Sequence, residues 1–275
     1  QETGWHKHCI RNFFGTETFP YIAISEQELE ELASSNADRG LTIPGVQKKL
    51  SLHHESGDGR GNRLTLVDYP AGYILKPQTQ EYKNLPEAEC LTMQMSEMLG
   101  VRVVPFALVK LADSLAYITK RIDRDGKECL AMEDFCQLSE RLSDDKYKGS
   151  YEGCARIIKK YSSHATLDLS EFFIRVVVAF MVGNSDMHLK NLSLIESAPA
   201  SRVFGLSEAY DFLPVNVVDT EIKEDLALSL NGKNSKLRRK DFLELAEYCS
   251  ISKEAAEKMI ASVVSKKDEC IQLCK

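Results

Sequence analysis

Two acidic residues and one amide near the middle of the chain have the types and the spacing of a phosphoryl-transfer site. Asp186 stands five positions before Asn191 in the run 183–191, and Asp211-Phe212 follows twenty residues after Asn191. A carboxylate can accept a hydroxyl proton, and an amide oxygen with a second carboxylate suits Mg²⁺. Kinase catalytic loops use this order of residues. We therefore predict Asp186 as the catalytic base, Asn191 and Asp211 as Mg²⁺ ligands, and ATP as the phosphoryl donor.

Basic residues accompany this run and a second region of the chain. His188 and Lys190 alternate with the predicted ligands and are candidates for contacts with the nucleotide phosphates. Lys76 ends a short strand-like run, as expected of a lysine that contacts the α- and β-phosphates. Such a lysine is held by a carboxylate on the following helix. The sequence offers two candidates there, Glu87 and Glu89, and does not choose between them.

The loop that binds the phosphates is harder to locate, because no G-x-G-x-x-G pattern is present. A turn before two lysines can present backbone N–H groups and positive charge to an anion. A competing candidate is the glycine-rich tip at residues 57–61, but glycines at such a tip are usual for a hairpin turn. We predict that the phosphate loop consists of Pro44, Gly45, Val46, Gln47, Lys48 and Lys49.

The elements expected before residue 123 are mainly strands. Apolar runs bounded by Gly, Pro and Asp predict strands at 50–53, 64–67 and 73–76 and a hairpin from 103–111 and 115–122. One helix is predicted to begin at Leu85 and to end at Gly100. Beyond about residue 130, helical periodicity dominates.

A long helix is predicted to lead directly into the run that carries Asp186. Asp168-x-x-Glu171 has the pattern of a capping box, and Gly183 is expected to end the helix. A short hairpin at 192–195 and 202–206 and two amphipathic helices near the carboxyl end complete the pattern. We predict an α+β, two-lobed protein-kinase-like fold, with a small β-rich N-lobe at 1–123 and a larger, mainly helical C-lobe at 124–275.

Composition limits the function classes. The chain has 275 residues and a net charge of −6, which argues against direct nucleic-acid binding because phosphate contacts need a basic face. Apolar runs are too short to predict a membrane span. The eight scattered cysteines lack a C-x-x-C pair, so we expect reduced thiols and a cytoplasmic location. The cluster Trp5 to Cys9 has the pattern of half a zinc knuckle, but no second ligand pair is present.

Six short motifs resemble the HipA-like serine/threonine kinases, which are toxins of bacterial type II toxin–antitoxin modules. They occur in the family's order between about residues 41 and 215: Pro44–Lys49, Ile74–Pro77, Lys120–Arg124, Met132–Gln137, Gly183–Asn191 and Ala209–Phe212. The chain is similar in length to the short, HipT-like forms, which lack the additional N-terminal subdomain of full-length relatives.

The resemblance implies further roles for individual residues. Lys120 and Ile122 would contact adenine through the hinge backbone, and Tyr210 would belong to the nucleotide site. Thr42 stands where relatives autophosphorylate a hydroxyl residue before the phosphate loop. Some relatives have a second serine two residues later, where this chain has Pro44, so we expect a switch at Thr42 alone.

The resemblance also implies partners. The family's substrates are aminoacyl-tRNA synthetases, whose phosphorylation inhibits translation. A cognate antitoxin is expected, as a helix-turn-helix DNA-binding protein, a small protein like the missing N-terminal subdomain, or both.

Two other functions remain open. A small-molecule kinase of the choline or aminoglycoside type shares the Asp-x₄-Asn loop, although such enzymes usually have His where Ser185 precedes Asp186. A pseudokinase that binds nucleotide or a partner would keep the fold without transfer.

Overall fold

The computed structural model describes residues 4–22, 24, 49–57, 61–67, 71–111, 114–125 and 128–275. The chain divides into two compact units. Unit 1 consists of Gln1–Cys90 and Pro105–Arg121, and unit 2 consists of Leu91–Val104 and Ile122–Lys275. The single boundary expected after residue 123 stays a prediction.

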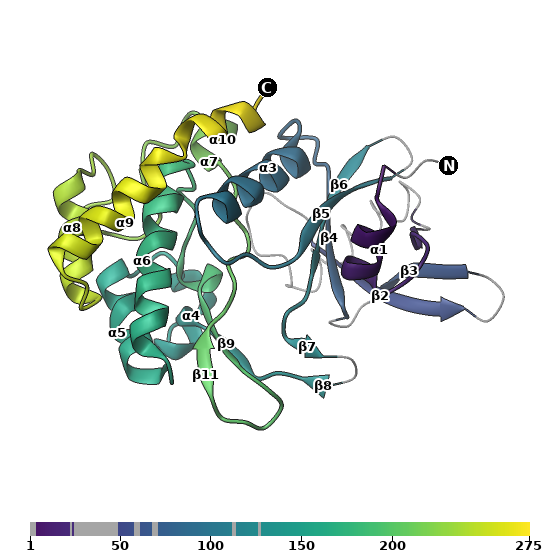
Figure 1. Cartoon of the computed structure of the whole chain (residues 1–275), viewed down its shortest axis with the longest axis horizontal. Helices are drawn as coiled ribbons and strands as arrows, with labels where there is room; N and C mark the ends of the chain where they lie inside the picture. The colour runs from purple at the N-terminus through teal and green to yellow at the C-terminus, as the bar shows by residue number, and fades with distance from the viewer. Residues whose placement is uncertain are drawn as a thin grey trace. The chain divides into compact units, whose positions relative to one another are not determined.

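Unit 1 is built on an antiparallel sheet that gains one parallel strand at its edge. Among the described residues, six strands pair in the order β1-β3-β2-β4-β6-β5 (Figure 1). The strands predicted at 50–53, 64–67 and 73–76 and the hairpin predicted from 103–111 and 115–122 are present, with boundaries shifted by a few residues. The strands are β1 (Tyr21–Ile22), β2 (Leu50–Gly57), β3 (Gly61–Val67), β4 (Tyr73–Pro77), β5 (Phe106–Lys110) and β6 (Leu115–Lys120).

An aromatic cluster packs helix α1 (Lys7–Phe14) against this sheet. The Trp5 ring lies 5.6 Å from Phe13 and 5.3 Å from Phe14, and both phenylalanine rings lie within 6 Å of Tyr73. Edge-to-face contacts of this kind add to the stabilisation from buried apolar area. Trp5, the first residue of the predicted half of a zinc knuckle, therefore packs on the core of unit 1.

Helix α3 (Leu85–Met98) follows β4 as predicted. Pro86 occupies the first turn, where a missing N–H costs nothing, and Gly100 after the last turn has φ 98°, a conformation open mainly to glycine. The helix fixes the direction of Glu87 and Glu89, which lie on its first turns.

Unit 2 contains most of the helices. The long helices α5 (Tyr151–Tyr161) and α6 (Ala165–Met181) pack together, and α8 (Arg239–Tyr248) and α9 (Lys253–Ser265) pack against them (Figure 1). Shorter helices are α4 (Phe135–Leu138), α7 (Val215–Val218) and α10 (Lys267–Leu273). No helix in the described ranges combines the length and apolar character needed to span a membrane.

A small sheet in unit 2 lies next to the segment that carries Asp186. The predicted hairpin is formed by β10 (Ser193–Glu196) and β11 (Phe204–Leu206). A third strand, β9 (Met132–Asp134), pairs with β10 and was not predicted, because three residues are too few to show a period. A separate short hairpin consists of β7 (Arg124–Asp125) and β8 (Glu128–Cys129).

The capping box expected at Asp168 is wrong. Helix α6 begins three residues earlier, at Ala165 with His164 as its N-cap. The Asp168 carboxylate is buried and instead accepts hydrogen bonds from the Ser162 hydroxyl at 2.6 Å and the Leu206 N–H at 2.8 Å. The hydroxyl of Ser162 and one backbone N–H of β11 therefore replace the backbone donor that a capping box would use.

Candidate active site

The end of α6 delivers the chain into the loop of residues 183–191, which we call the catalytic loop. Gly183 has φ 72°, its N–H bonds to the Phe180 carbonyl, and the N–H of Asn184 bonds to the Ala179 carbonyl at 2.8 Å. This pattern of two backward hydrogen bonds is a Schellman motif, which ends a helix at a residue in the left-handed region. The predicted end of the helix at Gly183 is confirmed. It fixes the point at which the loop that carries Asp186 begins.

Asp186 is partly buried and has a neutral hydrogen-bond donor. The Tyr147 hydroxyl donates to Asp186 Oδ1 at 2.6 Å, and the Tyr147 ring packs edge-on against His188 with centroids 5.0 Å apart. Burial, together with this hydrogen bond, raises the pKa of Tyr147, so its hydroxyl keeps its proton. The Asp186 carboxylate therefore faces a proton donor that water or a substrate hydroxyl can replace.

Asn191 and Asp211 come together as the sequence spacing predicts. Asn191 lies in the short 3₁₀ helix η2 (Leu189–Asn191), and its Nδ2 donates to Asp211 Oδ2 at 3.3 Å. Its Oδ1 accepts from the His188 N–H at 3.0 Å, which fixes the orientation of the amide. Two tethered oxygen-bearing side chains of this kind fit Mg²⁺, which keeps several waters and binds through one or two protein ligands. Across the described ranges, no cluster of three His, Cys, Asp or Glu side chains forms a metal cage.

The backbone before Asp211 is held by a segment far away in the chain. Ala209 N–H donates to the Arg102 carbonyl at 2.7 Å, and Val104 N–H donates to the Ala209 carbonyl at 3.0 Å. Arg175, fully buried in α6, donates to the Ser207 carbonyl at 2.8 Å. Asp211 itself has φ 59°, a left-handed conformation that is uncommon for a residue with a side chain and recurs at functional sites. Phe212 is fully buried and anchors the turn.

Lys190 and Tyr210 lie beside the same pair. Lys190 forms an ion pair with Asp134 at 3.0 Å. Tyr210 bonds to the Ser193 hydroxyl at 2.5 Å and donates to the Lys190 carbonyl at 3.2 Å. Burial raises the pKa of Tyr210, which keeps the hydroxyl protonated for this second bond. These contacts link the catalytic loop to β9 and β10.

In unit 1, Lys76 is paired with Glu89 and not with Glu87. The lysine ammonium and the carboxylate form a hydrogen-bonded ion pair in which both side chains are more than nine-tenths buried. The ammonium also lies 5.3 Å from the centre of the Tyr117 ring. A buried charge needs a partner of this kind, so the helix that follows β4 selects one of the two glutamates left open by the sequence.

Three further predicted residues, Lys49, Lys120 and Ile122, lie in the described part of the chain. Lys120 is exposed at the end of β6, with its N–H bonded to the Pro105 carbonyl, and Ile122 is partly buried two residues later. Lys49 is exposed immediately before β2. Thr42, Pro44, Gly45, Val46, Gln47 and Lys48 lie outside the described residues.

Sequence reasoning missed two side chains of the site. Tyr147 is 39 positions before Asp186 and Asp134 is 56 positions before Lys190, so neither shares a motif with its partner. Asp134 falls inside the Met132–Gln137 run, which the family resemblance did single out. Nothing in the local pattern around Tyr147 distinguishes it from an ordinary surface tyrosine.

Comparisons with known proteins show which family the chain resembles. Residues 41–271 match the model of the HipA-like C-terminal domain. The chain is 32% identical over 243 residues to the candidate kinase Y4dM of Sinorhizobium fredii, covering 83% of this chain and 58% of that protein. It is 27% identical over 290 aligned positions to a candidate kinase of Haemophilus influenzae, covering 92% of this chain and 80% of that protein.

Solved structures show the same fold. HipA of Shewanella oneidensis MR-1, from a toxin–antitoxin complex of HipA, HipB and operator DNA, superposes with a TM-score of 0.69 at 17% identity, covering 84% of this chain and 58% of that chain. The proinflammatory kinase CtkA of Helicobacter pylori gives 0.50 at 14% identity, covering 81% of this chain and 94% of that chain.

The chain thus spans 58% of the length of Y4dM and of the HipA chain. The α+β, protein-kinase-like fold expected from the sequence is confirmed. With a family model that matches most of its residues, the chain belongs to the HipA-like C-terminal domain family.

Proposed function

We propose that this chain is an ATP- and Mg²⁺-dependent serine/threonine protein kinase. The observation that carries the proposal is the hydrogen-bonded pair of Asn191 and Asp211, held in one unit with Asp186 by the catalytic loop. Base and metal ligands then come from a single packed body. Membership of the family and the likeness to candidate kinases support the same activity.

In the proposed reaction, Asp186 accepts the proton of a serine or threonine hydroxyl of the substrate, and the oxygen of that hydroxyl forms a bond to the γ-phosphorus of ATP. The bond from that phosphorus to the oxygen bridging it to the β-phosphate breaks, and ADP leaves with that oxygen. Mg²⁺, when held by Asn191 and Asp211, supplies positive charge that offsets the charge on the phosphate oxygens. His188 and Lys190 are proposed as further nucleotide contacts, and Tyr210 as the residue that orients the Lys190 backbone.

In unit 1, Glu89 is proposed to orient Lys76 toward the α- and β-phosphates. The buried pair fits this role, because a lysine held on one carboxylate is already positioned before nucleotide binds. The Pro44–Lys49 loop is proposed to bind the phosphates, and the backbone at Lys120 and Ile122 to bind adenine.

The biological role is proposed by analogy with the HipA structure, which comes from a toxin–antitoxin complex with HipB and operator DNA. By this analogy, the chain is a toxin held by a cognate antitoxin. The antitoxin would supply the DNA contact that a chain with net charge −6 lacks. An aminoacyl-tRNA synthetase is the proposed substrate, and Thr42 the proposed site of inactivating autophosphorylation.

The test is transfer from radiolabelled ATP with Mg²⁺, to the chain itself and to a panel of aminoacyl-tRNA synthetases. Asp186→Ala is expected to lower transfer by about 10²- to 10⁴-fold, because it removes the general base. The matched control is Asp144→Ala, which removes an exposed carboxylate elsewhere in unit 2. Both variants should melt within a few degrees of the wild type.

Each alternative has its own outcome. If no protein is labelled but ATP is consumed when choline or an aminoglycoside is added, the chain is a small-molecule kinase. ATP binding without any transfer would indicate a pseudokinase. Full transfer by Asp186→Ala would refute the assignment of the base.

A further inference from the structure

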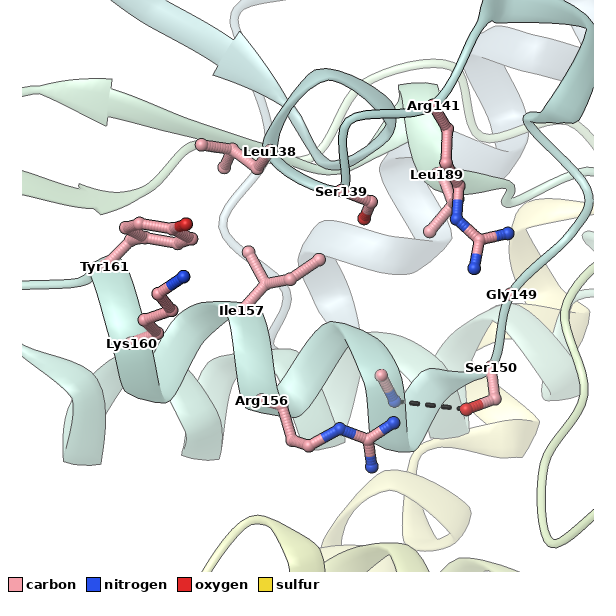
Figure 2. Close-up of a pocket in the computed structure, with 11 residues that line it drawn as sticks. Leu138, Ser139, Arg141, Gly149, Ser150, Arg156, Ile157, Lys160, Tyr161 and Leu189 are labelled. Atoms are coloured by element: carbon pink, nitrogen blue, oxygen red, sulfur yellow. Dashed lines mark hydrogen bonds between the residues drawn. The ribbon is translucent and has the colours of Figure 1, made fainter.

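A cleft in unit 2 is lined by both apolar and positively charged side chains. This cleft of about 450 Å³ lies between α5 and the segment that follows α4, and we call it the α5 groove (Figure 2). Its apolar lining comes from both walls: Leu138 and Leu189 on one side and Ile157 of α5 on the other. Arg156 and Lys160 extend from α5, and Arg141 extends from the opposite wall.

The three cations of the groove are available to a ligand. Among the described residues, none of Arg141, Arg156 and Lys160 takes part in an ion pair, and all three are exposed. Lys160 lies over the Tyr161 ring, 4.5 Å from its centre, which holds the ammonium at one end of the groove. Three neighbouring cations without an ion pair among the described residues are notable in a chain whose net charge is −6.

The groove shares its walls with the catalytic loop. Leu189 lies in η2, immediately after His188, and its N–H donates to the Lys146 carbonyl at 3.1 Å. Gly149 faces the Leu189 side chain so closely that a Cβ at that position would lie 3.3 Å from it. The segment between these two contacts carries Tyr147, whose hydroxyl bonds to Asp186. A chain bound in the groove would therefore lie in the same unit as the candidate base and against its supporting loop.

We propose that the α5 groove docks an acidic segment of the protein that this chain phosphorylates, with an apolar side chain on the groove floor and flanking carboxylates on the three cations. This inference rests on the proposed kinase function. The mixed lining favours a peptide over a free anion, because Leu138, Ile157 and Leu189 offer nothing to a lone phosphate. Three cations on an acidic chain are also too few for tight binding of a nucleic-acid backbone.

The binding test uses a fluorescein-labelled peptide of alternating glutamate and leucine, and a second peptide in which glutamine replaces every glutamate. The wild type is expected to bind the glutamate peptide at least about tenfold more tightly at low salt. The double variant Arg156→Glu, Lys160→Glu should lose about tenfold in affinity for it. The matched control, Lys159→Glu with Lys253→Glu, reverses two exposed charges outside the groove and should keep wild-type affinity.

Three outcomes of the binding test would overturn the proposal. Equal binding of both peptides would show that charge is not recognised. Equal loss in the control variant would indicate a general electrostatic effect. Tighter binding of a single-stranded oligonucleotide than of the peptide would point to nucleic acid instead.

A kinetic arm separates this proposal from that of the kinase function. The substrate is a protein that the wild type phosphorylates. For this substrate, the KM of the groove variant should be about tenfold higher, whereas its kcat and its transfer of phosphate to the chain itself should be unchanged. Wild-type protein that binds the peptide but transfers no phosphate would overturn the kinase function while leaving the docking surface in place. Active wild type with no change of KM in the groove variant would do the reverse.

Discussion

Glu89 in unit 1 and Asp186 in unit 2 are both carboxylates at proposed kinase positions, but their surroundings differ. Glu89 is 1% exposed and bonds to a charged donor, the Lys76 ammonium. Asp186 is partly buried and accepts from a neutral donor, the Tyr147 hydroxyl, whose side chain is half exposed.

The difference indicates what each carboxylate can do. A buried carboxylate paired with a cation cannot lose its partner without leaving a charge in an apolar environment, so it is suited to holding that cation in place. A carboxylate bonded to an exposed hydroxyl can exchange it for another hydroxyl at little cost. In unit 1, Glu89 holds the Lys76 ammonium in a fixed position. In unit 2, Asp186 can exchange one hydroxyl partner for another.

Breaking the unit 1 pair is expected to have the largest effect on stability. Glu89→Ala should destabilise the protein by about 3–5 kcal/mol, because the Lys76 ammonium is left buried without its carboxylate. Urea unfolding followed by circular dichroism measures this change. The matched control is Glu97→Ala, which removes an exposed glutamate from the same helix and should change stability by less than about 0.5 kcal/mol.

Removing both partners sharpens the same comparison. The double variant Lys76→Met, Glu89→Leu should recover most of the lost stability, because two apolar side chains can fill the space without a charge. It should not transfer phosphate from ATP, since the proposed contact of Lys76 with the phosphates is gone. Recovery of transfer in this variant would contradict the role proposed for Lys76.

Asp241 in α8 offers a carboxylate of unit 2 with a structural role. Burial would raise its pKa, but hydrogen bonds from Lys233, Asn231 and the Arg238 N–H outweigh burial and lower the pKa from 3.8 to about 2. Since the folded pKa lies below the unfolded value, the stabilisation is fully present above pH 3.8 and is lost as the pH falls toward 2. We expect the lowered pKa of Asp241 to contribute about 1–2 kcal/mol to the free energy of unfolding at pH 7.

The measurement is urea unfolding of wild type and Asp241→Asn as a function of pH. The stability difference between them should be largest near neutral pH and should shrink below pH 3.8. Asp268→Asn, an exposed change in α10, serves as the control and should show no such trend. A difference that grows on acidification would contradict the lowered pKa of Asp241.

The sequence predicted those parts of the site that are local in the chain. Asn191 meets Asp211 because the loop and the β10–β11 hairpin between them are short and regular, and Gly183 ends α6 because its position requires a positive φ. The strands β2 to β6 could also be predicted, because turn residues bound their apolar runs. The fold class could therefore be predicted from the sequence.

Contacts between distant segments could not be predicted in this way. Asp168 has the spacing of a capping residue, yet its carboxylate accepts a hydrogen bond from the Leu206 N–H of β11. The local sequence pattern carries no information on such a tertiary contact. The choice of Glu89 over Glu87 depends on which side of α3 faces β4. The bond from Tyr147 to Asp186 depends on how the segment before α5 returns to the catalytic loop.

Tyr147 provides the smallest expected effect and the most direct test of exchange in unit 2. Tyr147→Phe should lower kcat by about 3- to 10-fold, because the carboxylate of Asp186 loses a hydrogen bond that orients it. The melting temperature should stay within about 2–4 °C of the wild type. Tyr248→Phe, which removes an equally exposed hydroxyl from α8, should leave kcat unchanged.

A titration then tests the contact itself. Burial and the bond to Asp186 raise the pKa of Tyr147 above its ordinary value of 10.0, so its phenolate should appear only at strongly alkaline pH in the difference absorbance between wild type and Tyr147→Phe. Asp186→Ala removes the negative charge that disfavours the phenolate, and the same signal should then appear at lower pH. A Tyr147 signal that does not respond to Asp186→Ala would mean that the two groups do not interact in solution. In that case, Tyr147 would not orient the Asp186 carboxylate, and the contrast with Glu89 would rest on burial and not on the hydrogen bond from Tyr147.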